Sequence, residues 1–316
     1  MSKSYMRKNS NNVSKEEIVT SLKQTGLKLG DVVFVHSAMR TLGWVDGGAQ
    51  TVVSAFLEVI GERGTLVVPT FTFAHEAEEE PIIDPANDPS EMGIITETVR
   101  RRPDALRSTA FRHSVAAVGR RAGVITEVDP ALSPFDLRSS FGVMLSLNTQ
   151  IVLLGMTYAT STSHHVSELL CEVPYRHTLE LDIKVRQQDG SIIKQKMTDY
   201  QPKPSGTGSY YGSRHPDFNR LGKMIEDKGL VGIATIGNAV VRRFGLRDLA
   251  DLALVEAEKD YNIFRTPEGE PDYYTPLEFG KVVFSPEMLD GAGRPGKYQW
   301  CVVDESKLAM PNHNLA

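Results

Sequence analysis

Two ionisable side chains, His165 and Glu168, follow closely after the apolar run at 150–155. The run predicts a buried strand, and the residues after it predict a polar loop that enters a short helix. Because side chains at positions i and i+3 share a helix face, both can point into the same cleft. An imidazole beside a carboxylate forms a base for chemistry near pH 7.

A helix-surface ion pair explains the same spacing equally well and contributes only about 0.2–0.5 kcal/mol. The position after a strand favours a functional pair, because ligands of α/β sheets bind at the carboxyl ends of strands. On a helical wheel His165 lies at the boundary between an apolar side with Val166 and Leu169 and a polar side with His164 and Glu168. A side chain at such a boundary is partly desolvated and still reaches a ligand.

Binding of a metal ion by His164, His165 and Glu168 is an alternative, and it would make the protein a metal-dependent hydrolase. Neighbouring residues of a helix point about 100° apart, whereas the HExxH motif places both histidines on one face. We therefore predict no metal and keep hydrolysis as a second hypothesis. The two cysteines, Cys171 and Cys301, lack CxxC spacing and predict neither a disulfide framework nor a thiolate zinc site.

The composition narrows the class of partner. With 35 basic and 40 acidic residues and a formal charge of −5, the chain lacks the basic surface that binds nucleic acid. The arginines at 100–102 are interpreted as a solvated helix end. No apolar run is long enough to span a bilayer, and residues 1–12 are polar without a leader-like core. We therefore expect a cytoplasmic protein with a small-molecule partner, no nucleic acid and no membrane.

Hydrophobic periodicity predicts a β-α-β unit at the start of the chain. A helix begins at the N-cap Ser14 and stops at Gly26, and strands at 31–36 and 64–69 flank a helix that carries Val52 to Ile60. Such a unit implies a parallel strand pair with a right-handed crossover. The glycine-bearing loop between the first strand and its helix leaves backbone N–H groups to meet an anion, or serves only as a tight connection.

The remaining pattern predicts one α/β domain at 13–260 with a mixed, largely parallel central sheet and helices on both faces. Residues 1–12 are predicted to form a disordered tail, and 261–316 an irregular C-terminal extension packed on the same domain. A β-hairpin or flap at about 177–200 is indicated by strict alternation before the turn Asp189-Gly190. Further expected elements are a surface loop at 74–90, helices at 92–102, 217–228 and 246–258, an apolar stretch at 114–118, a run at 230–234, a mobile glycine-serine stretch at 205–213, and a strand at 281–284.

Ten short motifs occur in a specific order along the chain. They are VHSAMRTLG at 35–43, GG at 47–48, GTLVVP at 64–69, MGIITE at 92–97, PDALRS at 103–108, HSVAAVG at 113–119, SP at 133–134, VLLG at 152–155, 165–174 with its HVSE start, and GLVGIA at 229–234. Together they resemble the aminoglycoside 3-N-acetyltransferase family, whose fold is unrelated to the GNAT fold. The resemblance covers residues 14 to 258, and it places the last core strand of the family at 229–234.

The resemblance implies transfer of an acyl group, usually acetyl, from acetyl-CoA to an amine, with His165 acting on the attacking amine. It implies coenzyme A contacts in the segments that match those of the family: Ser37, Ala38, Met39, Arg40, Thr41, Leu42, Pro69, Thr70, Arg107, Ser108 and Ser114. The residues expected to contact the acceptor are Phe71, Glu172, Asp199 and Tyr200.

The chemistry is consistent with these roles, because an ammonium cannot attack a thioester until a neutral imidazole removes its proton. Glu168 either orients His165 or holds a second ammonium of the acceptor. Backbone N–H groups at 37–42 are candidate donors to the oxyanion, and transfer is expected to be direct, without an acyl-enzyme. The acidic side chains at 76–84 and Glu172 either attract a polycationic acceptor or belong to a solvated loop.

Two departures from the family pattern concern the acceptor. Resistance enzymes tend to have Glu-Tyr-Asp before the glycine loop, where this chain has Asp199-Tyr200-Gln201. The chain also extends beyond the usual end of the family, near residue 260. We therefore expect an aminoglycoside, an amino sugar or another natural-product amine as acceptor, with antibiotic resistance as the associated role. A non-catalytic coenzyme A-binding protein is the third hypothesis, and a monomer or homodimer is expected.

Overall fold

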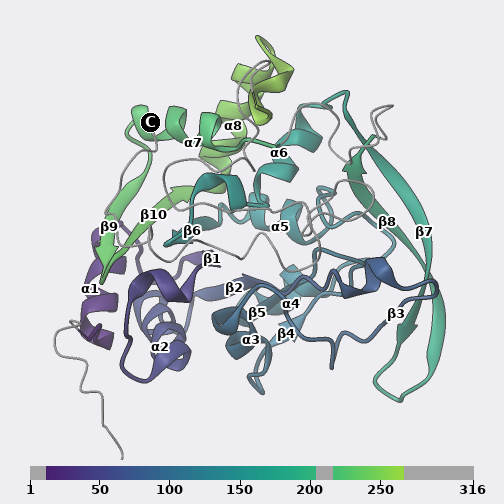
Figure 1. Ribbon diagram of the computed structural model, residues 1–316, viewed down its shortest axis with the longest axis horizontal. Coiled ribbons are helices and arrows are strands. Elements are labelled where there is room, and N and C mark those ends of the chain that lie inside the picture. The colour runs from purple at the N-terminus through teal and green to yellow at the C-terminus, as the bar shows by residue number, and fades with distance from the viewer. Residues whose placement is uncertain (1–11, 204–215, 267–316) are drawn as a thin grey trace, which may run out of the picture.

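The computed structural model describes residues 12–203 and 216–266 (Figure 1). Most of the predicted N-terminal tail, the glycine-serine stretch at 205–213 and the strand at 281–284 lie outside the described residues. No helix in the described part is long and apolar enough to cross a membrane.

A seven-stranded mixed sheet forms the centre of the molecule, in the order β4-β5-β2-β1-β6-β10-β9. Its middle strands β1 (Val32–Ser37), β2 (Thr65–Pro69) and β6 (Gln150–Leu154) are parallel. The flanking strands pair antiparallel: β4 (Leu106–Arg107), β5 (Val115–Gly119), β9 (Gly232–Ile236) and β10 (Ala239–Gly245). The predicted mixed sheet is confirmed, although antiparallel pairing is more extensive than expected because β9 and β10 form a hairpin and β5 returns beside β2.

Helices cover both faces of the sheet, as predicted, because the strand residues alternate between two apolar cores. In β1, Val33 and Val35 pack with α1 (Lys15–Gln24), α2 (Gly48–Ile60) and α3 (Ile94–Arg100). Phe34 packs on the opposite face. The elements on that face are α4 (Ala122–Thr126), α5 (Ser140–Ser146), α6 (His164–Leu170), α7 (Asn219–Asp227), α8 (Leu246–Ala257) and η4 (Tyr261–Phe264).

The first helix begins as the sequence predicts. The Ser14 hydroxyl accepts a hydrogen bond from the Glu17 amide at 3.2 Å, and the helix ends before Gly26, which adopts φ +91°. The Glu17 side chain does not complete the reciprocal capping interaction at this end; its carboxylate accepts from the Gly237 amide at 3.0 Å. This contact ties α1 to the turn between β9 and β10.

A second, three-stranded sheet contains the predicted hairpin, which extends over β7 (Arg176–Arg186) and β8 (Ile192–Pro202). Gly190 takes φ +84° in its turn. The predicted surface loop at 74–90 is not entirely loop, because it contains η2 (Ala74–Ala77) and β3 (Ile82–Ile83), which pairs with β7. Ile83 packs with three hairpin side chains in a small core of its own. Figure 1 shows the hairpin along one edge of the molecule.

The last core strand is β10, not the stretch at 229–234 that the sequence indicated. β10 pairs with β6, while β9 is the edge strand beyond it. Two arginines interrupt the apolar pattern of β10 and conceal it in the sequence. Arg242 bonds Glu226 at 2.8 Å, and Arg243 bonds the Thr25 carbonyl at 2.9 Å, so both charges have partners at the sheet surface.

Candidate active site

The site lies where the parallel strands β1 and β6 end together, with Ser37 opposite Leu154 in the register. The chain turns sharply at Gly155, which has φ +66° and lies so close to Thr41 that a Cβ would collide with its hydroxyl. From there it passes through η3 (Tyr158–Thr160) into α6. The predicted loop after β1, which includes η1 (Met39–Leu42), and the histidine helix are therefore neighbours.

His165 and Glu168 form a buried hydrogen-bonded pair. The imidazole Nδ1 is 2.6 Å from the carboxylate Oε2, and the side chains are 12% and 1% exposed. Because an ionised carboxylate only accepts hydrogen bonds, Nδ1 carries the proton and Nε2 keeps a lone pair. The lone pair of Nε2 is therefore available to accept a proton.

Two further side chains hold Glu168. The Tyr175 hydroxyl donates to Oε1 at 3.1 Å, and Arg176 Nε forms an ion pair with Oε2 at 2.7 Å. Glu172 makes this possible, because it ends α6 in the left-handed region at φ +49° and turns the chain toward β7. Glu172 itself is exposed.

The electrostatics favour a neutral imidazole beside an ionised carboxylate. Burial lowers the pKa of His165, and the nearby charge of Arg176 lowers it further against the opposing hydrogen bond to Glu168. Burial alone would raise the pKa of Glu168, but Arg176, His165 and Tyr175 together hold that pKa below its usual value. At neutral pH the base is therefore ready to accept a proton.

The partly exposed boundary position predicted for His165 is confirmed, but the polar side of the helical wheel does not face solvent. His164 and Glu168 are both buried, because α6 packs against α8 and the core around Val166. The His164 ring stacks on Phe218 with centroids 4.4 Å apart, and its Nδ1 lies 3.0 Å from the Ser161 carbonyl. Burial lowers the pKa of His164 to about 3.

The described residues offer no support for a metal centre. Within them, no group of three or more His, Cys, Asp or Glu side chains is placed to hold an ion. Aromatic rings surround the His165–Glu168 pair instead. The rings of Phe135, Phe218 and His113 lie 5.1, 5.3 and 6.2 Å from the His165 ring. Burial also keeps the pKa of His113 well below its usual value.

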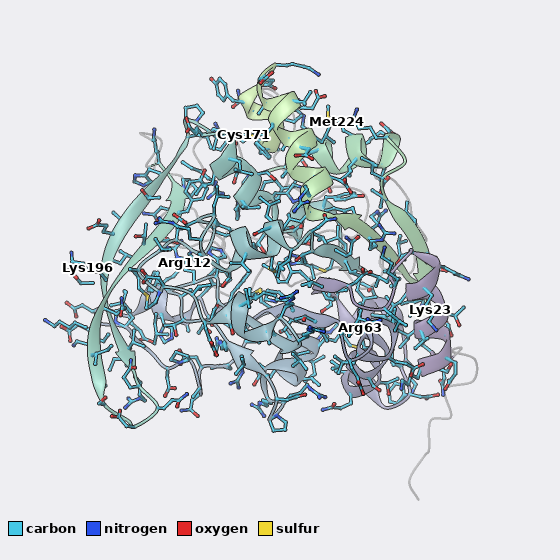
Figure 2. The ribbon with its side chains drawn as sticks, turned by 180° about the vertical axis from the view of Figure 1, so that it is seen from behind. Lys23, Arg63, Arg112, Cys171, Lys196 and Met224 are labelled. Atoms are coloured by element: carbon cyan, nitrogen blue, oxygen red, sulfur yellow. The ribbon has the colours of Figure 1, made fainter. Side chains whose placement is uncertain are left out.

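Three of the four residues predicted to contact the acceptor lie near these aromatic rings. Phe71 contacts the His113 ring edge-on at 4.8 Å, and the Tyr200 ring lies 6.2 Å from Phe135. Asp199, next to Tyr200 on β8, is buried and forms an ion pair with Arg112 at 3.5 Å. Figure 2 shows Arg112 between the hairpin and the main body of the molecule.

The predicted coenzyme A residues divide into two groups. One is the loop at 37–42, where the Ala38 amide donates to the Leu154 carbonyl at 2.9 Å and the Thr41 amide donates to the Ala38 carbonyl at 3.1 Å. Met39 is half-buried and Arg40 is exposed, whereas Leu42 is buried. The loop thus presents both backbone and side chains at the carboxyl end of β1.

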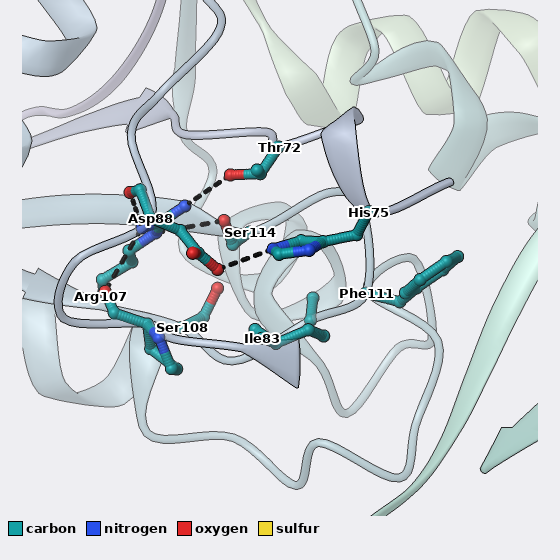
Figure 3. Close-up of a pocket in the computed structure, with 10 residues that line it drawn as sticks. Thr72, His75, Ile83, Asp88, Arg107, Ser108, Phe111 and Ser114 are labelled. Atoms are coloured by element: carbon teal, nitrogen blue, oxygen red, sulfur yellow. Dashed lines mark hydrogen bonds and ion pairs between the residues drawn. The ribbon is translucent and has the colours of Figure 1, made fainter. Parts of the chain in front are cut away.

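The second group surrounds a cavity of about 10 Å³ beneath the loop at 84–90 (Figure 3). Arg107 donates to the carbonyls of Asp88 at 2.6 Å and Thr70 at 2.7 Å. The Ser114 hydroxyl donates to the Thr70 carbonyl at 2.8 Å, and the Ser108 hydroxyl accepts from the Val115 amide at 2.9 Å. These side chains join the end of β2, just after Pro69, to the loop and to β5; their contact with coenzyme A stays a prediction.

Sequence reasoning did not single out Tyr175, Arg176, Phe135 and Phe218 as parts of the site, and it quoted His113 only within a motif. The pair Tyr175-Arg176 directly follows the recognised stretch at 165–174. An ionisable residue at the start of a strand next to a buried carboxylate is a usable signal, but only once that carboxylate is known to be buried.

The fold and the site combine a mixed α/β sheet with a buried histidine–carboxylate pair at the carboxyl edge of its parallel strands. Residues 34–256 match the family model described as aminoglycoside 3-N-acetyltransferase. Aminoglycoside N(3)-acetyltransferase VII of Streptomyces paromomycinus is 28% identical over 279 residues, covering 81% of this chain and 96% of that protein. Aminoglycoside N(3)-acetyltransferase IV of Salmonella sp is 29% identical over 261 residues, covering 81% and 92%.

A likeness in structure agrees with these matches. The solved structure of AAC-IIIb in a binary complex with CoASH is 20% identical, with a TM-score of 0.68, and the match covers 83% of this chain and 100% of that one. The chain belongs to the aminoglycoside 3-N-acetyltransferase family. It is an N-acetyltransferase that uses acetyl-CoA, and the predicted family, enzyme class and co-substrate are confirmed.

Proposed function

We propose that this enzyme acetylates an amine of an aminoglycoside or a related amino sugar by direct transfer, with His165 as the general base. The observation that carries the proposal is the buried hydrogen bond of 2.6 Å between His165 Nδ1 and Glu168 Oε2 at the carboxyl edge of the sheet. The named relatives act on aminoglycosides, which supports this class of acceptor.

The proposed reaction moves one acetyl group and removes two protons from the acceptor nitrogen. His165 Nε2 removes a proton from the acceptor ammonium, and the amine nitrogen attacks the thioester carbonyl of acetyl-CoA. The tetrahedral intermediate then loses the thiolate as the C–S bond breaks, and the imidazolium returns a proton to the sulfur. A second proton leaves the amide nitrogen to solvent. Glu168 holds the imidazole in the required tautomer and stabilises its charged form.

Acetyl-CoA is a co-substrate, and the two segment groups are the proposed contacts for it. The loop at 37–42 is the proposed source of oxyanion donors, although the amides of Ala38 and Thr41 already donate within the protein. Cys171 supports direct transfer, because burial raises the pKa of its thiol to about 11 and keeps it protonated and weakly nucleophilic.

The test is release of free thiol from acetyl-CoA across a panel of aminoglycosides and amino sugars. The His165→Ala variant should lose about 10²- to 10⁴-fold in kcat, the usual contribution of a general base. Cys171→Ala, one residue beyond the same helix, is the matched control and should keep wild-type turnover. Near wild-type turnover by His165→Ala would exclude His165 as the base.

The same experiment addresses both alternatives. A metal-dependent hydrolase would lose activity on chelation, whereas acetyl transfer by the dyad should be unaffected. A non-catalytic coenzyme A-binding protein would bind acetyl-CoA tightly and release no thiol with any amine of the panel.

A further inference from the structure

Arg112 connects two carboxylates that come from different parts of the fold. It lies in the segment between β4 and β5, with Nε 3.2 Å from Glu76 Oε1 on η2 and Nη1 3.5 Å from Asp199 Oδ2 on β8. The three side chains are 13%, 23% and 3% exposed. We call Glu76, Arg112 and Asp199 the bridging cluster. Its side chains are too buried to act as an ordinary surface ion pair.

The bridging cluster borders the proposed base. Arg112 is followed by His113, whose ring lies 6.2 Å from the His165 ring. Asp199 is followed by Tyr200, whose ring lies 6.2 Å from Phe135, and Phe135 lies 5.1 Å from His165. The charge of Asp199 also acts on His165, where it favours the protonated imidazole. The carboxylates therefore lie on the side of the site formed by the hairpin, next to the base.

The contact between Arg112 and Asp199 is looser than a good charged hydrogen bond. Typical N⁺–H···O⁻ distances are about 2.7–2.9 Å, whereas this pair is at 3.5 Å. Asp199 Oδ2 is buried and accepts no hydrogen bond from any residue in the described ranges. A buried carboxylate oxygen without a donor is costly, so a better placed cation would be bound there favourably.

We propose that Arg112 is a specificity-determining residue that acts as an internal counter-ion for the acceptor-side carboxylates. The Arg112 guanidinium offsets part of the negative charge of Glu76 and Asp199, so it weakens the attraction of the bridging cluster for cations. Acceptors with a single ammonium, such as amino sugars, are therefore favoured, and the guanidinium penalises acceptors with several ammonium groups. This inference rests on the proposed function.

The test compares Arg112→Gln with wild type on two acceptors, glucosamine with one amine and tobramycin as a polycation. Removing the guanidinium should raise kcat/KM for tobramycin about tenfold, equivalent to about 1.4 kcal/mol, at low ionic strength. The change for glucosamine should be smaller than about threefold. Because the bridging cluster is largely buried, the gain should persist in about 0.5 M salt, which screens mainly solvent-exposed charges over a Debye length of a few ångström. An unchanged ratio between the two acceptors would overturn the inference.

Arg112→Lys keeps the charge and should keep the wild-type ratio, so it separates charge from packing if Arg112→Gln folds poorly. A ratio that rises for Arg112→Lys as much as for Arg112→Gln would also overturn the inference. Calorimetric binding of tobramycin to wild type and both variants gives a readout that needs no turnover. If no amine supports thiol release, the proposed function fails; the inference fails separately if Arg112→Gln does not tighten tobramycin binding relative to wild type.

Discussion

Two buried arginine–carboxylate clusters flank the same histidine, and they differ in how tightly they are held. Arg176 lies 2.7 Å from Glu168, whose two oxygens also bind His165 and Tyr175. Arg112 lies 3.5 Å from Asp199, whose Oδ2 accepts no hydrogen bond from the described residues. The first arrangement suits the proposed proton transfer, because the rate of such a step depends on accurate placement of the reacting groups. In the second arrangement Asp199 Oδ2 has no close donor among the described residues, so an incoming cation could bind it more closely than Arg112 does.

The two clusters also differ in origin along the chain. The partners of Glu168 lie within twelve residues, from His165 to Arg176, so one short helix and the turn after it set their geometry. The bridging cluster joins positions 76, 112 and 199, and it depends on the docking of the hairpin through β3. Local geometry therefore sets the proposed base, whereas long-range packing sets the proposed acceptor side.

After the loss of His165 itself, the largest expected effect comes from changing Glu168, the carboxylate of the more tightly held cluster. Glu168→Gln keeps the shape but removes the charge that orients His165 and compensates Arg176. We expect kcat to fall about 10- to 100-fold, as for other partners that orient a reacting group, with little change in KM for acetyl-CoA. Steady-state kinetics measure both constants, and thermal unfolding serves as the control for folding. A kcat within twofold of wild type would contradict the role of Glu168.

Arg176→Met tests whether that arginine sets the protonation of the base. Arg176 lowers the pKa of His165, so its loss should raise that pKa. The imidazole would then be protonated up to a higher pH, and the acid limb of kcat/KM should move to higher pH while activity in the alkaline range changes less. Its measurement is a pH–rate profile, with Cys171→Ala as the control that keeps the wild-type limb. A purely structural role would lower activity at every pH without moving the limb.

The smallest expected effect is at Tyr175, the third partner of Glu168. Tyr175→Phe removes a hydrogen bond of 3.1 Å but leaves the ion pair to Arg176 intact. A single hydrogen bond is worth about 1 kcal/mol, so kcat should fall only about fivefold. Comparison with Glu168→Gln in the same assay ranks the contributions of Tyr175 and Glu168 to kcat. A loss equal to that of Glu168→Gln would mean that Tyr175, and not Arg176, holds the Glu168 carboxylate in position.

Prediction from the sequence worked best for elements whose residues show a clear hydrophobic pattern or a capping or turn residue. The N-cap at Ser14 and the hairpin turn at Gly190 are confirmed because each depends on neighbouring residues. The parallel pair of β1 and β2 is confirmed because one helix connects the two strands as a β-α-β unit. The strand β10 was missed because Arg242 and Arg243 interrupt its apolar pattern. β3 was missed because two residues are too short for any period, and its pairing with β7 is a tertiary event.

The sequence alone determined the family, the enzyme class and the pairing of His165 with Glu168, because one helical turn brings residues three apart together. Only the tertiary structure decided that this pair is buried, that Arg176 is held at 2.7 Å from its carboxylate, and that Arg112 joins Glu76 to Asp199. The physical reason is that spacing along a helix is local, whereas burial and ion pairing between distant segments depend on how the sheet, the hairpin and the helices pack against one another.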